Sequence, residues 1–399
     1  MEKFMRDILI ASFDLEVGGV ERSLISMLDN FDYENNKVDL MLYSHTGDFM
    51  NLLTDKVNLL DENKKYKTFR KGIGQIIKDG NLLIGGSRIL ARCKGNNRNI
   101  NNDIESVSQM QYMWKYSMPF LPKIDKEYEV AISYLWPHYF IAEKVKAKIK
   151  IAWIHTDYST IDTDIKEDLR IWSKFDYIIA VSEECRNSFL NKYPSLKIKV
   201  KVMENITSPN FVRKMAKEEV SEVLGSEDEF NIVSVGRLSY AKGIDNAVKA
   251  LRLLHDKGLE NIKWDVIGYG EKEEVIKKLI KENMLEDSFY LLGKKINPYP
   301  YMKKCDLYVQ PSRYEGKAVT VTEAKILGKP IVITNYLTAK SQITNKVDGY
   351  ITDLSVKGIA DGIEKLYKDK ELRDSLSSNC INSDYSNKYE LENLYRLFV

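Results

Sequence analysis

Two carboxylates eight residues apart, Glu315 and Glu323, lie in the stretch of the chain that is richest in chemically useful side chains, DLYVQPSRYEGKAVTVTEAKILGKP at 306–330. A carboxylate accepts two hydrogen bonds at once, which suits the vicinal hydroxyls of a ribose or of another sugar. Two Glu residues at this spacing also occur by chance in an acid-rich chain. The setting of the pair therefore has to decide whether it forms a site.

A second candidate is a pair of cations, Arg237 and Lys242, on a glycine-flanked loop that follows the apolar run at 230–235. An Arg side chain can hold a diphosphate through a two-pronged hydrogen bond, and a Lys side chain adds a compact charge. Cations placed there stabilise negative charge that develops on a diphosphate leaving group. The alternative is that both are solvated surface charges.

Two weaker candidates lie in the first half of the chain. The pair Gly18-Gly19 follows the first apolar run and would let the backbone approach a phosphate or a sugar closely. His155 follows the apolar run at 149–154, which predicts a position at the end of a strand; a hydrogen-bonded structural histidine is the alternative. No HxH, HExxH or paired-Asp pattern indicates a metal site, so we expect neither a metal nor a cofactor.

Short apolar runs separated by polar or helix-like segments must position these residues. Alternation of this kind predicts parallel sheets covered by helices. At 311–317 a loop leads from one run into a helix that begins near Val319, and such a helix N-terminus favours anionic groups. The runs lie at 7–13, 38–43, 130–134, 149–154 and 177–181, and then at 230–235, 263–267, 288–292, 306–310 and 331–334.

The chain has 399 residues, which predicts two domains rather than one core. The pattern of strands starts again after 204–211, where Asn, Ser and Pro interrupt the periodicity. We therefore expect an N-terminal Rossmann-like domain at 1–207, a C-terminal Rossmann-like domain at 208–380, and a last segment at 381–399.

Composition excludes several classes of protein. Lys and Arg number 60 against 58 Asp and Glu, and 44% of residues are hydrophobic, which describes a globular protein and gives no reason to expect a nucleic-acid partner. The four cysteines lie far apart without a CxxC pair, which favours a reducing cytoplasm. The chain shows no signal-peptide core and no apolar run of roughly 20 residues, so any membrane contact is expected to be peripheral.

One segment, at 64–98, departs from this balance because it carries ten basic residues against a single acid, Asp79. Apolar residues interleave the cations, so the segment could form amphipathic faces that dock on anionic lipid headgroups. The alternative is a pair of surface helices packed on the first domain, and the glycines at 80 and 85–86 weaken any single long helix. The apolar residues are Phe69, Ile73, Ile76, Ile77, Leu82, Leu83, Ile89 and Leu90.

Taken together, the motifs resemble those of the retaining glycosyltransferases of family 4, which have the GT-B architecture of two Rossmann-like domains facing across a cleft. The resemblance covers most of the chain. It rests on Gly18-Gly19-Val20-Glu21, Val235-Gly236-Arg237-Leu238 with Lys242-Gly243, Ile267-Gly268-Tyr269-Gly270, and Pro311-Ser312 through Glu315-Gly316 to Glu323-Ala324 with Gly328-Lys329-Pro330.

The resemblance implies a role for each candidate. Arg237 and Lys242 would hold the donor diphosphate, Glu323 the ribose hydroxyls, and both Glu315 and His155 would lie by the donor sugar. It also implies that the C-terminal helix at 381–399 returns to the first domain. The other donor-binding positions that it implies are Gly18, Gly19, Gly236, Lys295, Ile296, Gly316, Lys317, Ala318 and Val319.

The resemblance further implies a metal-independent reaction that moves a hexose from a nucleotide-sugar donor, expected to be a UDP-sugar, with retention at the anomeric carbon. The usual Glu-Gly-Phe-Gly appears here as Glu315-Gly316-Lys317-Ala318, a variant found among bacterial surface-polysaccharide transferases. We therefore expect a glycan acceptor, carried on a lipid, for an enzyme in the cytoplasm with peripheral contact at the inner face of the membrane.

Two other functions compete with this interpretation. A nucleotide-sugar epimerase of the same architecture would need additional acid–base carboxylates and no acceptor groove. A non-catalytic partner subunit that binds a nucleotide-sugar would be expected to lack Arg237, Lys242 or Glu323, and all three are present. A nicotinamide-dependent dehydrogenase would need GxGxxG after the first strand, and the sequence has none there.

Overall fold

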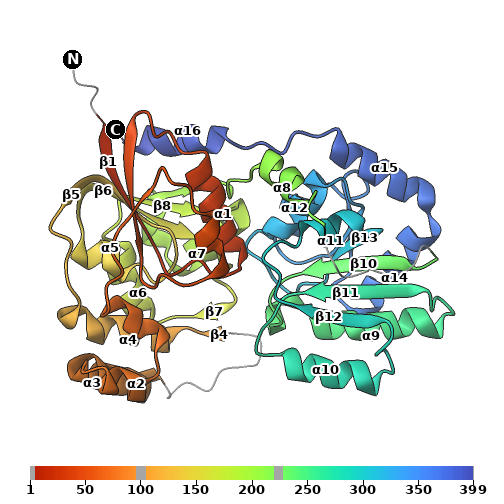
Figure 1. Cartoon of the computed structure of the whole chain (residues 1–399), viewed down its shortest axis with the longest axis horizontal. Coiled ribbons are helices and arrows are strands. Elements are labelled where there is room, and N and C mark those ends of the chain that lie inside the picture. The colour runs from red at the N-terminus through yellow and green to blue at the C-terminus, as the bar shows by residue number, and fades with distance from the viewer. Residues whose placement is uncertain (1–4, 96–104, 220–227, 399) are drawn as a thin grey trace. The chain divides into compact units, whose positions relative to one another are not determined.

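A computed structural model of the protein describes residues 5–95, 105–219 and 228–398. The chain divides into two compact units (Figure 1). The first comprises Met1–Glu16, Val20–Ile206 and Lys388–Val399, and the second Val17–Gly19 and Thr207–Asn387. The unit boundary at 206–207 falls in the segment where the sequence loses its periodicity.

The first unit is built on a seven-stranded sheet in the order β3-β2-β1-β5-β6-β8-β9. All of its neighbouring strands run parallel. A two-stranded sheet pairs β4 (Glu105–Ser106) with β7 (Ile161–Asp162). The strands of the large sheet are β1 (Arg6–Ser12), β2 (Asn36–Leu42), β3 (Asn58–Leu59), β5 (Glu127–Ser133), β6 (Lys146–Ile154), β8 (Tyr177–Ala180) and β9 (Val200–Val202).

The C-terminal helix α16 (Tyr389–Tyr395) belongs to the first unit although it ends the chain. The Tyr395 ring lies 5.3 Å from that of Phe31, centroid to centroid, and its hydroxyl accepts a hydrogen bond from the Asp32 amide at 2.8 Å. The other helices of this part of the chain are α1 (Gly19–Asp29), α2 (Ile73–Lys78), α3 (Leu82–Gly95), α4 (Ser108–Ser117), α5 (Tyr139–Lys144), α6 (Ile165–Trp172) and α7 (Glu183–Lys192).

The described part of the basic segment, 64–95, forms a 3₁₀ turn, η2 (Tyr66–Arg70), followed by α2 and α3. Helix α2 packs on α3, and α3 packs beside α4 (Figure 1). Phe69 and Ile76 are buried, so these two residues do not lie on an outer apolar face. Arg98, which was counted among its cations, lies outside the described residues. Across the described ranges, none of the helices combines the length and the apolar character that a membrane span requires.

The second unit is built on a six-stranded sheet in the order β12-β11-β10-β13-β14-β15, again with all neighbours parallel. Its strands are β10 (Phe230–Val235), β11 (Ile262–Ile267), β12 (Phe289–Gly293), β13 (Leu307–Gln310), β14 (Ile331–Thr334) and β15 (Tyr350–Thr352). Its helices are α8 (Pro209–Met215), α9 (Ile244–Asp256), α10 (Glu273–Glu282), α11 (Tyr299–Lys304), α12 (Val319–Ile326), α13 (Ala339–Gln342), α14 (Val356–Lys368) and α15 (Lys370–Ile381).

Helices cover both faces of this second sheet (Figure 1). Because successive side chains of a strand point to opposite faces, Ile232 packs in one apolar cluster with α9 and α14, and Val233 packs in another with α11 and α12. The predicted α/β class, with two parallel sheets, is confirmed. The strand order reverses between β10 and β13, and ligands of such sheets gather outside the strand ends at this point.

Candidate functional site

Two loops meet at the switch point of the second sheet. One follows β10 and contains η5 (Tyr240–Lys242); the other follows β13 and leads into α12. Gly243 adopts a left-handed conformation with φ of 64°, and a Cβ atom there would lie 2.1 Å from the carbonyl oxygen of Pro311. Only glycine fits so close to the neighbouring loop.

Arg313 fastens these two loops together. Its guanidinium donates to both carboxylate oxygens of Asp245, at 2.8 and 2.7 Å, and lies 4.2 Å from the centroid of the Tyr240 ring. Burial by itself would raise the pKa of Asp245, but the hydrogen bonds and the charge of Arg313 lower it. The loop that carries Lys242 is thereby held in place by charged contacts.

Lys242 and Glu315 form an ion pair across the two loops, with 2.5 Å between the Lys242 Nζ and the Glu315 Oε1. The Lys242 side chain is 22% exposed and that of Glu315 is 10% exposed, so the pair lies at the edge of the solvent. A Cβ atom at Gly236 would lie 3.3 Å from the Lys242 Cδ, so the glycine leaves room for the lysine stem. The structure therefore brings three of the predicted residues together.

Gln310, the last residue of β13, supports this ion pair through a hydrogen bond to Glu315. Its Nε2 donates to the Ser312 hydroxyl at 2.8 Å and to Glu315 Oε1 at 3.1 Å. Its Oε1 accepts from the Tyr308 hydroxyl at 2.7 Å and from the Thr320 hydroxyl at 3.1 Å. Because both ends of the amide are engaged, its orientation is defined.

Glu315 has one occupied carboxylate oxygen and one available one. Oε1 accepts from Lys242, from Gln310 and from the Ser312 hydroxyl, the last at 2.6 Å. Within residues 5–95, 105–219 and 228–398, Oε2 accepts no hydrogen bond. A bound hydroxyl group can therefore donate to Oε2 without displacing a protein partner.

Glu323 lies on α12 and is 1% exposed. Its Oε1 accepts a hydrogen bond from the Tyr299 hydroxyl at 2.8 Å. Tyr299 opens α11 and is itself buried, so it fixes the orientation of the carboxylate. Glu323 is thus a buried, oriented acceptor, whereas Glu315 is a partly exposed member of an ion pair.

Arg237 is exposed in the loop after β10. In the part of the chain that the structure describes, its guanidinium has neither a hydrogen-bond nor an ion-pair partner, so it is available to an anion. Two other predicted residues follow β12. The Lys295 Nζ lies 5.7 Å from the centroid of the Tyr301 ring, and Ile296 is 47% exposed.

The predicted backbone contacts lie at the start of α12. Gly316 and Ala318 are buried, and Lys317 and Val319 are half-buried. Ala318 precedes the first residue of the helix, and its amide donates to the Gln342 Oε1 at 3.0 Å. A ligand that used this amide would have to displace that side chain.

Gly18 lies in the loop between β1 and α1, Gly19 is the first residue of α1, and His155 directly follows β6. His155 Nε2 lies 2.9 Å from the carbonyl oxygen of Tyr134, so Nε2 carries the proton and donates it. Nδ1 is buried and has no partner among the described residues. Burial lowers the pKa of His155 to about 4, against the opposing effect of that hydrogen bond, so the ring is neutral at pH 7.

Gln310, Arg313 and Tyr299 were not among the residues predicted from the sequence. A polar residue at the end of an otherwise apolar strand was the available signal for Gln310. The roles of Arg313 and Tyr299 follow from contacts with residues distant in the sequence, and no spacing reveals them. The described residues contain no group of three or more His, Cys, Asp or Glu side chains arranged to hold a metal ion.

Comparison with known proteins finds one family and several relatives that match part of the chain. Residues 216–382 match the family described as glycosyl transferases group 1. The chain is 29% identical over 180 residues to the capsular polysaccharide biosynthesis glycosyltransferase CapM of Staphylococcus aureus, covering 43% of this chain and 47% of CapM. It is 29% identical over 170 residues to the poly(glycerol-phosphate) alpha-glucosyltransferase of Bacillus subtilis, covering 42% of this chain and 25% of that enzyme.

These alignments span less than half the length of either relative. The structure as a whole is similar to that of Anabaena HepE in complex with UDP-glucose, with a TM-score of 0.68, 17% identity and 98% of each chain covered. At that identity the likeness concerns the fold. The segment 216–382 thus matches the glycosyl transferases group 1 family, and the chain as a whole has the GT-B fold.

Proposed function

We propose that the protein is a retaining, metal-independent glycosyltransferase that moves a hexose from a UDP-sugar to a glycan acceptor in the synthesis of a bacterial surface polysaccharide. The observation that carries the proposal is the Lys242–Glu315 pair at the switch point of the second sheet. The loop of Lys242 also carries Arg237, whose guanidinium has no partner among the described residues. A ligand with an anionic part and a hydroxylated part matches these groups.

Lys242 keeps hydrogen-bonding capacity for a diphosphate while it stays paired with Glu315. An ammonium group donates three hydrogen bonds, and Glu315 accepts one of them. Two donors remain, and Arg237 adds a fork that suits phosphate oxygens. The leaving diphosphate would thus meet two cations that are in place before the donor binds.

The two carboxylates receive different parts of the donor. The available Oε2 of Glu315 is assigned to a hydroxyl of the sugar. The buried carboxylate of Glu323, oriented by Tyr299, is assigned to the ribose hydroxyls. Lys317 stands two residues after Glu315, and we assign it to the choice of sugar.

In the proposed reaction the acceptor hydroxyl attacks the anomeric carbon from the side of the leaving group. The bond between that carbon and the diphosphate oxygen breaks, and the departing phosphate takes the proton of the acceptor. The configuration is therefore retained. Arg237 and Lys242 stabilise the charge on the leaving group, a contribution of about 10²–10³-fold in rate for each such donor.

The names of the relatives support the choice of substrates. CapM is named for capsular polysaccharide synthesis, and HepE was crystallised with UDP-glucose. The acceptor is proposed to be a glycan carried on a lipid, which the protein reaches through peripheral contact with the inner face of the cell membrane.

The test is a screen of thermal stability and donor hydrolysis against UDP-, GDP- and ADP-sugars, with and without a chelator. We expect stabilisation and slow hydrolysis with a UDP-hexose, unchanged by chelation. Interconversion of the sugar without release of UDP would identify an epimerase instead. A non-catalytic binding subunit would bind the nucleotide-sugar but neither hydrolyse nor interconvert it. It would also fail to transfer the sugar to membrane glycolipid extracts.

A further inference from the structure

Helix α3 has two apolar sides, of which one is covered. Ile84 and Ala91 are buried and belong to the inner side, together with the buried Arg88. The guanidinium of Arg88 lies 5.4 Å from the centroid of the Phe69 ring, and that ring stacks on Trp114 of α4 at 4.0 Å. The inner side of α3 is therefore committed to the first unit.

The outer side of α3 exposes four large apolar side chains. Leu82 and Leu83 are each 66% exposed, Leu90 is 60% exposed and Ile89 is 48% exposed. At about 100° of rotation per residue, these four and Cys93 fall within one stripe of roughly 120°. We name this stripe, defined by Leu82, Leu83, Ile89, Leu90 and Cys93, the outer stripe.

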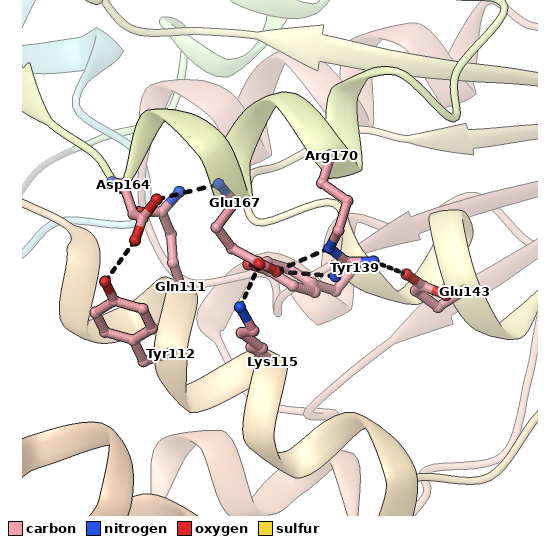
Figure 2. A network of polar contacts seen from close by, with 8 residues as sticks. All are labelled: Gln111, Tyr112, Lys115, Tyr139, Glu143, Asp164, Glu167 and Arg170. Atoms are coloured by element: carbon pink, nitrogen blue, oxygen red, sulfur yellow. Dashed lines mark hydrogen bonds and ion pairs between the residues drawn. The ribbon is translucent and has the colours of Figure 1, made fainter. Parts of the chain in front are cut away.

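Polar contacts fix α4, the helix against which the inner side of α3 packs. On α4, which carries α3, Lys115 pairs with the Glu167 carboxylate at 2.6 Å, and the Tyr112 hydroxyl donates to Asp164 at 2.5 Å (Figure 2). Arg170 links Glu167 to Glu143 of α5. Since Glu167 is only 4% exposed, breaking these bonds would leave a buried charge without partners, so α4 is held firmly against α6.

Positive charge surrounds the outer stripe. On the helix circumference Lys94 lies on one side of the stripe and Arg92 on the other, and both are exposed. Lys78, at the end of α2, is exposed as well. The acid of this segment, Asp79, is neutralised by Lys71 at 2.5 Å. An apolar stripe between cations, on a convex helix, matches a surface of acyl chains beneath anionic headgroups.

We propose that the outer stripe docks on an anionic lipid bilayer, with Leu82, Leu83, Ile89 and Leu90 entering the headgroup–acyl boundary. Arg92, Lys94 and Lys78 then lie at the level of the phosphates, where long cationic side chains extend to the polar layer. The inference rests on the proposed function in one respect, since a lipid-linked acceptor gives the docked enzyme its substrate. We favour a membrane over the groove of a partner protein because cations flank the outer stripe on both sides, as anionic headgroups require.

The native cysteines provide the probe. Cys93 lies on the outer stripe and is exposed, whereas Cys185, Cys305 and Cys380 are buried. An environment-sensitive fluorophore is attached to Cys93 of the full chain. Its emission should shift to shorter wavelengths when vesicles of phosphatidylglycerol and phosphatidylcholine are added. Vesicles of phosphatidylcholine alone, or 1 M salt, should lower the bound fraction at least tenfold.

The variant Leu82→Gln/Leu90→Gln should lower the vesicle partition coefficient at least tenfold, and Arg92→Glu/Lys94→Glu should abolish the preference for anionic lipid. Ile198→Gln is the matched control, because Ile198 is 90% exposed elsewhere in the same unit and its substitution should change nothing. All these positions are exposed, so folding should be unaffected, and circular dichroism checks this. Flotation of the unlabelled proteins gives a second measurement.

Unchanged partition of Leu82→Gln/Leu90→Gln, or equal binding to neutral and anionic vesicles, would overturn the inference. The inference would also be overturned if the unchanged protein formed a dimer and Leu82→Gln/Leu90→Gln made it monomeric. The outer stripe would then be an interface between two copies of the chain. Hydrolysis of UDP-sugars without vesicles separates the two proposals. Hydrolysis without vesicle binding refutes the docking alone, and vesicle binding without any reaction refutes the proposed function alone.

Discussion

Replacing Gln310 by Leu tests whether the hydrogen bonds of the Gln310 side chain hold the site together. The substitution keeps the volume of the side chain and removes its four hydrogen bonds. Tyr308 is 0% exposed, so its hydroxyl would be left buried without its acceptor. An unsatisfied buried donor costs about 1–3 kcal/mol, and we expect a loss of that size in the free energy of unfolding of the second unit.

The same substitution removes one of the donors on the Glu315 carboxylate. A hydrogen bond to a charged group contributes about 1.5–3 kcal/mol, which corresponds to a change of about 10-fold or more in an equilibrium or a rate. Lys242 and Ser312 still hold Glu315 Oε1, so the ion pair survives but is less well fixed. We expect kcat/KM for the UDP-sugar to fall by about 10-fold.

A second change separates stability from activity. In Tyr308→Phe/Gln310→Leu both partners are apolar, so the unsatisfied donor is gone and most of the stability should return, to within about 1 kcal/mol of the original. The kinetic defect should remain, because Glu315 still lacks its donor. Urea unfolding and donor turnover measure the two effects. A double variant with restored turnover would show that Gln310 acts only through the stability of the fold.

Three further predictions concern other residues. Arg237→Ala should lower turnover by about 10²–10³-fold without changing the unfolding curve, whereas Arg213→Ala, at an exposed position on α8, should leave both unchanged. Tyr299→Phe removes the hydroxyl that orients Glu323, so calorimetry should show about 10-fold weaker binding of UDP; unchanged affinity would argue against Glu323 as the ribose ligand. Burial, with a smaller effect of a neighbouring histidine, lowers the pKa of His138 to about 3, so the folded state stays neutral while the unfolded state binds a proton below pH 6.5. The folded state therefore loses stability as the pH falls, and His138→Asn should lose roughly 2 kcal/mol less than the unchanged protein between pH 7 and pH 5 in urea unfolding; equal losses would show that the buried ring does not cause the effect.

The sequence determined the elements whose signal is local. Apolar runs bounded on one side by Gly or Pro predicted β10 and β14 with the bounds that the structure has. The order of loop motifs located Lys242 and Glu315 before their contact was known. Short strands at sheet edges, such as β3 and β15, were missed, because two or three residues carry no periodicity and depend on pairing with a neighbour.

Only the tertiary structure decided which groups meet. Lys242 and Glu315 are 73 residues apart, and Arg237, from the same loop as Lys242, does not join their contact. In α3 the sequence offers apolar residues on both sides, so periodicity could not tell Ile84 from Leu83. Packing on α4 buries Ile84 and leaves Leu83 exposed to solvent. The reason is that only one side of a surface helix can face the core.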